Sequence, residues 1–323
     1  MSKVPVSFLK CKVIEKNYYF FAARPDDLDE DAEFSRIFFY DDEDHGNKWR
    51  HLDLPHITVE SLCVVITAID GHRCYAALSK EGSVSFIRTD RRWLEKVGDS
   101  GVKTRDVLPI YGYLNALKEI SGELYACGGG GQIYRRNSGE WVDIAGDLRK
   151  STPDLTQPIP LNQIKLGEDI SDIDGYANDD IYAAGMDGIY HYNGVSWTAC
   201  DNPTDEILTS VLCLPGRKVF ACGFNGTILS GNARQGFKDI SHYDDNMILT
   251  KVVEFQGDLY FSSNAGLFSM NKGEAGSRLQ KIQEVDDCED ISVLDDVLLC
   301  VGWKTIQIFQ SGRWKQLLHP DND

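Results

Sequence analysis

The chain has 323 residues, and it is short of basic side chains and of long apolar runs. It holds 33 Lys and Arg against 50 Asp and Glu, which gives a net charge of −17. Neutralising a phosphate backbone requires clustered cationic side chains, so this deficit argues against a nucleic-acid binder. The longest apolar stretch, residues 61–69, is interrupted by Thr67 and has the length of a strand. We therefore expect no membrane span and no membrane partner.

Signals for export and for disulfide bonds are also missing. The first ten residues, MSKVPVSFLK, lack the apolar core and the cleavage site of a secretory signal, which predicts a cytoplasmic protein. The nine cysteines are odd in number and scattered singly, without a CxxC pair, so we expect reduced and mostly buried thiols. The apolar fraction of 42% excludes a disordered chain and allows a sizeable core.

Patterns that carry catalysis or bind metals are absent. The seven histidines show no HExxH or similar ligand spacing, and His191, which lies between two tyrosines, fits a packed or surface position better than a base. Gly128–Gly131 is not followed by the Lys-Ser/Thr of a phosphate-binding loop. The acidic runs 26–33 and 286–290 lack the Asp-x-Asp-x-Asp-Gly order of a calcium loop. We predict no catalytic residues, no metal site and no cofactor.

The chain does contain an internal repeat. Segments 122–141, 180–197 and 216–237 each show a short apolar strand, a glycine-containing turn, a second strand, another turn and an aromatic residue that opens a third strand. An alternating segment such as 208–214 precedes each of them. One unit is therefore predicted to hold four short strands joined by tight turns.

The aromatic residue that opens the fourth strand of each unit recurs along the whole chain. It falls at Trp49, Trp93, Trp141, Trp197, Phe237 and Trp314, with Leu279 as a substitute in the sixth unit. Seven units of about 46 residues match the length of a four-stranded propeller blade. A single blade cannot bury both of its faces, whereas a ring of blades buries them and leaves only short edges.

We therefore predict an all-β chain, a single domain folded as a seven-bladed β-propeller with four-stranded antiparallel blades. The predicted blades cover approximately residues 9–52, 58–97, 110–144, 170–199, 207–240, 248–282 and 290–318. The last unit supplies four strands of its own, so residues 3–8 could either add a strand or form a tail.

The fourth unit resembles a known group of repeats. Residues 170–185, 188–194 and 196–198 are similar to bacterial propeller repeats of the broad WD40/YVTN-like group. The match is close in units three to five, loose in six and seven, and poor in one and two, and the Gly-His and Trp-Asp hallmarks of WD40 repeats are absent. The resemblance implies a propeller and a binding role more than any one chemistry, so function has to be argued from a site.

The propeller topology predicts where the charge lies. With strands named A to D from the axis outward, the B–C and D–A connections emerge on one face and the A–B and C–D turns on the other. The acidic excess of the first B–C insertion and of the D–A loops is about as large as the net charge of −17; these segments are residues 26–33, 53–58, 98–110, 145–170, 201–207, 241–248 and 283–290. We predict one strongly acidic face, with an ordinary solvated surface as the alternative.

Large apolar residues are expected at turn tips in the middle of that face. Met186, Phe224 and Trp303 fall in B–C turns, where they would anchor a protein partner or else pack down over the channel. The predicted partner-binding residues are Asp26, Asp27, Asp29, Glu30, Asp31, Met186, Asp187, Asp205, Glu206, Phe224, Asp244, Asp245, Asp286, Asp287, Glu289, Asp290 and Trp303.

These features predict a non-catalytic protein, monomeric before complex formation, whose acidic face docks a basic protein partner. The role we expect is neutralisation of a toxin such as a nuclease. The acidic surface would cover the basic toxin, and in this pairing of charges the protein resembles immunity proteins of interbacterial toxin systems. One alternative is a ligand-binding or lyase-type propeller that uses the central channel, with Asp187, Asn225 and Asn264 as polar candidates. A third is an assembly or scaffold factor related to photosystem-associated propellers.

Overall fold

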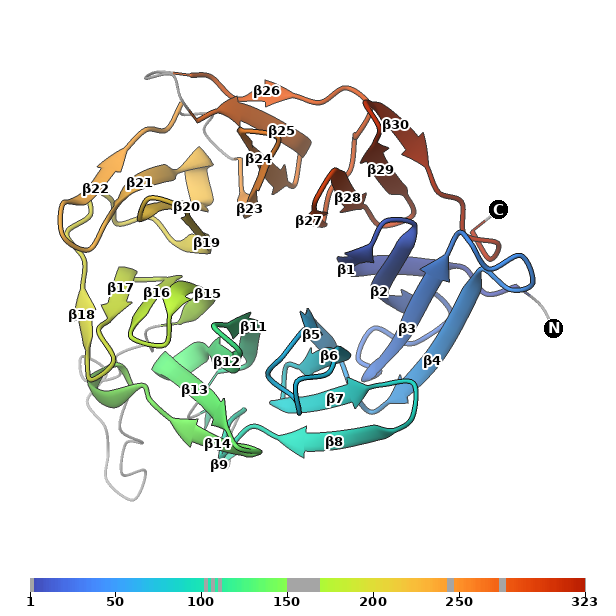
Figure 1. The fold of residues 1–323 in the computed structure, drawn as a ribbon, viewed down its shortest axis with the longest axis horizontal. Helices are drawn as coiled ribbons and strands as arrows, with labels where there is room; N and C mark the ends of the chain where they lie inside the picture. The colour runs from blue at the N-terminus through green and yellow to red at the C-terminus, as the bar shows by residue number, and fades with distance from the viewer. Residues whose placement is uncertain are drawn as a thin grey trace.

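The computed structural model describes residues 3–101, 104–105, 108–109, 112–149, 169–242, 247–272 and 277–322. Within these ranges the chain forms seven four-stranded antiparallel sheets set around a central axis (Figure 1). The prediction of an all-β, seven-bladed propeller is confirmed. In the described ranges, no helix is long and apolar enough to cross a membrane.

Each blade is a simple meander, with its strands hydrogen-bonded in sequence order and its first strand nearest the axis. Blade 1 consists of β1 (Val6–Glu15), β2 (Tyr18–Pro25), β3 (Phe34–Asp41) and β4 (Trp49–Pro55). Blade 2 consists of β5 (Val59–Val65), β6 (Cys74–Ser79), β7 (Ser83–Ile87) and β8 (Arg92–Lys96). Blade 3 consists of β11 (Leu114–Ile120), β12 (Glu123–Gly128), β13 (Gln132–Asn137) and β14 (Glu140–Asp143). Blades 4 and 5 consist of β15 (Ile170–Ala177), β16 (Asp180–Gly185), β17 (Gly188–Tyr192) and β18 (Trp197–Ala199); and β19 (Leu208–Leu214), β20 (Lys218–Gly223), β21 (Ile228–Asn232) and β22 (Gly236–Asp239). Blades 6 and 7 consist of β23 (Leu249–Phe255), β24 (Asp258–Ser263), β25 (Gly266–Asn271) and β26 (Gln280–Lys281); and β27 (Asp290–Leu294), β28 (Val297–Val301), β29 (Ile306–Gln310) and β30 (Arg313–Gln316). A two-stranded ribbon, β9 (Thr104–Arg105) and β10 (Leu108–Pro109), follows blade 2.

The aromatic residues at the start of the outer strands pack as the repeat predicts. Trp93, in β8, stacks on Phe86 of β7 with ring centroids 4.9 Å apart. Trp49, at the start of β4, lies 4.9 Å from Tyr40 across the same sheet. The second strands are covered on both faces by neighbouring blades, and every residue of β28 is buried. All nine cysteines are unpaired and eight of them are buried, as expected from their spacing.

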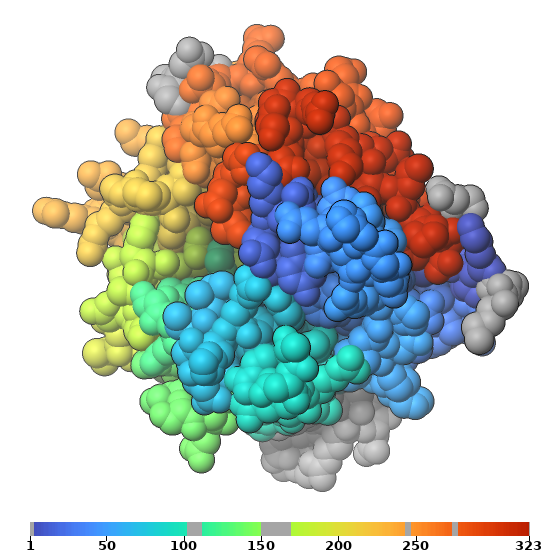
Figure 2. Space-filling view, turned by 45° about the vertical axis from the view of Figure 1, so that its right-hand side comes forward, coloured from blue at the N-terminus to red at the C-terminus, as the bar shows by residue number. Residues whose placement is uncertain are grey.

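The ring closes without exchange of a strand between the first and last blades. Residues 6–8 belong to β1, so blade 1 is complete in itself, and blade 7 supplies its own four strands. The Phe8 N–H donates to the Trp303 carbonyl at 2.9 Å, and the Asn322 side chain binds both the N–H and the carbonyl of Val6. Figure 2 shows the two blades, in blue and red, meeting along a continuous surface. Closure therefore rests on packing and on hydrogen bonds between blades.

Hydrogen bonds to polar side chains of the innermost strands link neighbouring blades. Each side chain accepts a hydrogen bond from a main-chain N–H on the innermost strand of the next blade. The pairs are Ser61 with Leu117 (3.1 Å), Asp172 with Val211 (3.0 Å), Asp174 with Cys213 (2.8 Å), Ser210 with Val252 (3.4 Å), Asp290 with Cys11 (2.9 Å) and Ser292 with Val13 (3.0 Å). These bonds satisfy buried polar groups on both partners, which explains why strands next to the axis carry Ser and Asp.

Glycines that end the second strands allow the loops to cross closely. A Cβ at Gly185 would lie 1.8 Å from the Asp169 carbonyl, and one at Gly223 would lie 2.0 Å from the Ile207 carbonyl. The residue after each glycine donates its N–H to that same carbonyl at 2.9 Å. B–C turns and D–A loops therefore lie in contact on one side of the ring. We call this side the upper face and the side with the A–B and C–D turns the lower face.

Candidate functional site

The insertion between β2 and β3 carries the densest group of carboxylates on the upper face. Asp27, Asp29, Glu30 and Asp31 are all exposed. Asp26 is also exposed, and it binds the Lys304 ammonium and, at 2.8 Å, the Ser7 hydroxyl. Partial burial raises the pKa of Asp26, but the hydrogen bonds from Lys304 and Ser7 outweigh it and leave the pKa below its ordinary value. Most carboxylates of this insertion are therefore exposed to solvent.

The remaining predicted carboxylates of the upper face lie in turns and loops around the ring. Asp187 and Asp205 are exposed, and the Glu206 carboxylate accepts a hydrogen bond from the Asn225 side chain at 2.8 Å. The Asp286 side chain is 92% exposed and lies 4.0 Å from the Lys281 ammonium, which is too distant and too solvated to neutralise it. Asp244 and Asp245 lie outside the described residues.

Trp303 stands on the upper face with its indole in solvent. Its side chain is 57% exposed, and its indole N–H donates to the Glu289 carboxylate at 2.6 Å. Its main-chain N–H donates to Asp287, also at 2.6 Å. Of the predicted carboxylates, Glu289 thus holds the ring at the surface and Asp287 holds the main chain of the turn, and the alternative that Trp303 folds into the channel does not hold. Phe224 and Met186 are half-buried in their turns.

Asp290 does not belong to this surface. It is the first residue of β27, it is only 5% exposed, and its carboxylate lies 2.6 Å from the Lys251 ammonium and 2.9 Å from the Cys11 nitrogen. Burial raises its pKa, but the charges of Lys251, Lys10 and Lys12 together outweigh burial and keep the pKa below its ordinary value. The acidic run 286–290 looks like one loop in the sequence, whereas its last residue is the first of strand β27 and its side chain is buried. The prediction of a partner contact at Asp290 is wrong.

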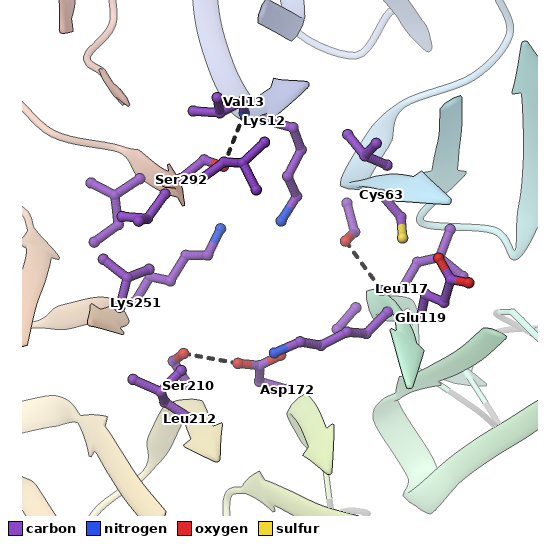
Figure 3. A pocket seen from close by; sticks show the side chains of 18 of the residues that line it. Lys12, Val13, Cys63, Leu117, Glu119, Asp172, Ser210, Leu212, Lys251 and Ser292 are labelled. Carbon is purple, nitrogen blue, oxygen red and sulfur yellow. Dashed lines mark hydrogen bonds between the residues drawn. The ribbon is translucent and has the colours of Figure 1, made fainter. Parts of the chain in front are cut away.

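A cavity of about 710 Å³ occupies the channel along the axis (Figure 3). Its lining includes the A–B turn residues Ile66, Thr67 and Ser121, so it opens toward the lower face. The polar candidates Asp187, Asn225 and Asn264 do not line it, because all three lie in B–C turns on the upper face.

Three lysines line this cavity instead: Lys12, Lys118 and Lys251. They escaped the sequence analysis, although a lysine at an alternating position of an inner strand, as in Leu9–Val13, is the signal that could have found them. His191 is packed against Tyr182 and lies 2.9 Å from the Asp180 carboxylate. Among the described residues no group of three metal-ligating side chains comes together.

The chain is similar in sequence to a protein named Immune protein Tsi7 from Pseudomonas aeruginosa. The two are 30% identical over 218 residues, which cover 66% of each chain, so the alignment spans slightly less than two thirds of that protein. A comparison with models of known protein families finds no match.

Solved propeller structures superpose on nearly the whole chain. The WD40 β-propeller domain of Doa1 has a TM-score of 0.65 at 9% identity and covers 96% of this chain and 95% of that one. A catalytically inactive virginiamycin B lyase from Staphylococcus aureus, with quinupristin, has a TM-score of 0.65 at 10% identity and covers 97% and 95%. YCF48 bound to D1 peptide has a TM-score of 0.61 at 11% identity and covers 96% and 94%. At these identities the likeness shows the fold alone. The chain is a seven-bladed β-propeller with WD40-like structural neighbours and a sequence relative that is named an immune protein.

Proposed function

We propose that this protein is an immunity protein, which binds a toxin and neutralises it without catalysis of its own. The observation that carries the proposal is the 30% identity to Immune protein Tsi7. That alignment leaves a third of each chain unmatched, so the identity of the toxin is not carried over with the role. The propeller supports the proposal physically, because a rigid ring presents its loops preorganised and little entropy is lost when a partner binds.

The uneven pairing of charge supports the upper face as the docking surface and a basic protein as the partner. On the lower face, the acidic C–D turn of blade 1 is neutralised in part: Asp42 binds Lys48 and Lys315, and Asp44 binds Arg50. The hydrogen bond from Lys48 is the largest effect that holds the pKa of Asp42 below its ordinary value. On the upper face, most carboxylates of the insertion 26–33 lack such partners among the described residues. A surface of this kind attracts a cationic one, such as the substrate cleft of a nuclease toxin in the cytoplasm.

Trp303 is the anchor that the proposal places within this surface. Tryptophan is among the residues that contribute most to protein interfaces, especially where surrounding groups exclude water. The Glu289 carboxylate already holds the ring in one orientation, and Asp287 holds the main chain beneath it, so the ordering of Trp303 on binding costs little. Loop carboxylates would then govern how fast the complex forms, and the buried indole would govern how slowly it dissociates.

Co-purification with the product of the adjacent gene, followed by titration calorimetry at low and high salt, tests the proposal. A variant that reverses four exposed upper-face carboxylates, with Asp27, Glu30, Asp205 and Asp286 each replaced by Lys, is expected to bind at least about tenfold more weakly. High salt is expected to reduce the difference, because the Debye length falls from about 10 Å at 0.1 M to about 3 Å at 1 M.

The matched control reverses four exposed lower-face carboxylates: Glu43, Glu140, Asp179 and Asp295. It changes the net charge by the same amount, so it is expected to lose less affinity than the upper-face variant. Equal losses in the two variants, or an affinity independent of salt, would contradict docking at the upper face.

A further inference from the structure

Three lysine side chains from blades far apart in the sequence converge on the central cavity. Lys12 comes from β1, Lys118 from β11 and Lys251 from β23, and Figure 3 shows the Lys12 and Lys251 ammonium groups pointing toward the axis. Ammonium groups that share one cavity repel one another unless anions lie between them. The cavity therefore raises the question of what balances each charge.

Two of these lysines form an ion pair within the fold, and among the described residues Lys12 forms none. The Lys118 ammonium lies 2.9 Å from Asp174, and the Lys251 ammonium lies 2.6 Å from Asp290. Among the described carboxylates, none forms an ion pair with Lys12. The neighbouring blade presents Cys63 to the cavity instead, and burial raises the pKa of that thiol to about 11, so it is neutral at pH 7.

The other carboxylates of the cavity are already engaged. Asp172 accepts hydrogen bonds from the Ser210 hydroxyl at 2.8 Å and from the Val211 nitrogen at 3.0 Å. Glu119, at the rim, accepts the N–H groups of the turn that follows β5. Glu254 lies 2.9 Å from the Lys272 ammonium. Lys12 is thus a lysine of the described cavity lining that makes no ion pair, because the Asp290 carboxylate, which favours its charged form from a longer distance, is already paired with Lys251.

The wall between Lys12 and the lower mouth is apolar. It includes Val64, Leu212 and Val253 from three inner strands, and it ends at Ile66 and Leu294, which are 53% and 38% exposed. Large aliphatic side chains left in solvent around an open cavity are typical of a ligand site, where an apolar body replaces the water. The cavity volume of about 710 Å³ falls within the range of small-molecule sites.

We propose that the central cavity binds a small organic anion with an apolar body, such as a medium-chain carboxylate. The carboxylate pairs with Lys12 and the chain lies along the aliphatic wall toward the lower mouth. This site is on the opposite side of the ring from the proposed toxin surface, so it does not depend on the immunity role. It also differs in chemistry, since the upper face would attract cations and the cavity selects an anion.

Titration calorimetry of the full-length protein at pH 7 with octanoate, octanol and octylammonium tests this site. Octanoate is expected to bind at least about tenfold more tightly than either of the other probes, because they lack the charge that Lys12 pairs with. Absence of octanoate binding, or equal binding of octanoate and octanol, would overturn the proposal.

Variants of β1 locate the site. Lys12→Met is expected to lower the affinity for octanoate at least about tenfold, whereas Lys12→Arg keeps the charge and retains binding. Lys10→Met is the matched control, since Lys10 lies on the same strand but outside the lining of this cavity, and it is expected to bind as the wild type does. Unchanged affinity in Lys12→Met, or an equal loss in Lys10→Met, would contradict the assignment.

Discussion

Replacing Lys12 with methionine should stabilise the protein at neutral pH, which is unusual for a change next to the core. Burial, reinforced by the nearby Lys251 charge, lowers the pKa of Lys12 from 10.5 to about 8. The unfolded chain then binds the proton more tightly than the folded one. The charged side chain therefore disfavours folding at every pH below about 8, and this penalty disappears as the pH rises from about 8 to about 10.5.

The size of the effect follows from the pKa difference. Lowering a pKa from 10.5 to about 8 corresponds to about 3 kcal/mol, at about 1.4 kcal/mol for each tenfold change in the proton equilibrium. The Lys12 side chain is partly open to the cavity, and solvent screening there reduces the penalty. We expect Lys12→Met to raise the free energy of unfolding by about 1 to 3 kcal/mol at pH 7.

Lys251→Met provides the contrast, because it removes a lysine that has a partner. It leaves the buried Asp290 carboxylate without the ammonium that lies 2.6 Å away, so the free energy of unfolding should fall by about 3 kcal/mol. Urea unfolding followed by tryptophan fluorescence at pH 7 and pH 10 measures both variants. A destabilised Lys12→Met protein at pH 7, or a gain that is the same at both pH values, would refute the reasoning.

Three further predictions concern the turns, the anchor and the thiols. Gly185→Ala should lower the free energy of unfolding by about 2 kcal/mol, because a Cβ at this position would lie 1.8 Å from the Asp169 carbonyl. Gly46→Ala is the control in the same urea assay, because a Cβ there has room and the free energy of unfolding should stay unchanged. Trp303→Ala should weaken toxin binding by about 2 kcal/mol in calorimetry and leave the melting temperature unchanged, since the ring is 57% exposed; a large loss of melting temperature would show a structural role instead. Native protein should react slowly with a thiol reagent until urea is added, because eight of its nine cysteines are buried; rapid labelling of several thiols in the folded state would contradict this.

The blade architecture is predictable because the repeat places one large aromatic residue where each outer strand starts. Trp93 and Phe86 stack across adjacent strands, and this local contact depends only on the repeat frame. The mode of ring closure is not predictable in this way. It depends on hydrogen bonds between residues about 300 positions apart, such as Val6 and Asn322, which no local pattern reveals.

The site was predictable only in part, for a similar reason. Topology alone assigns the turns and loops to one face, and it places Trp303 at a turn tip with carboxylates near it. It does not show that Asp290 turns inward to meet Lys251, because that depends on where the strand begins and on which residue the preceding blade presents. Lys12 stayed unnoticed because its significance lies in the lack of an ion pair with a neighbouring blade, which only the assembled ring reveals.

Hydrogen exchange of the protein alone and in complex with its toxin would test most directly whether the acidic face is the docking surface. The account predicts that slowed exchange is confined to the B–C turns and D–A loops, with the strongest effect around Trp303 and in residues 26–33. Slowed exchange confined to the A–B and C–D turns, with the upper face unchanged, would contradict it.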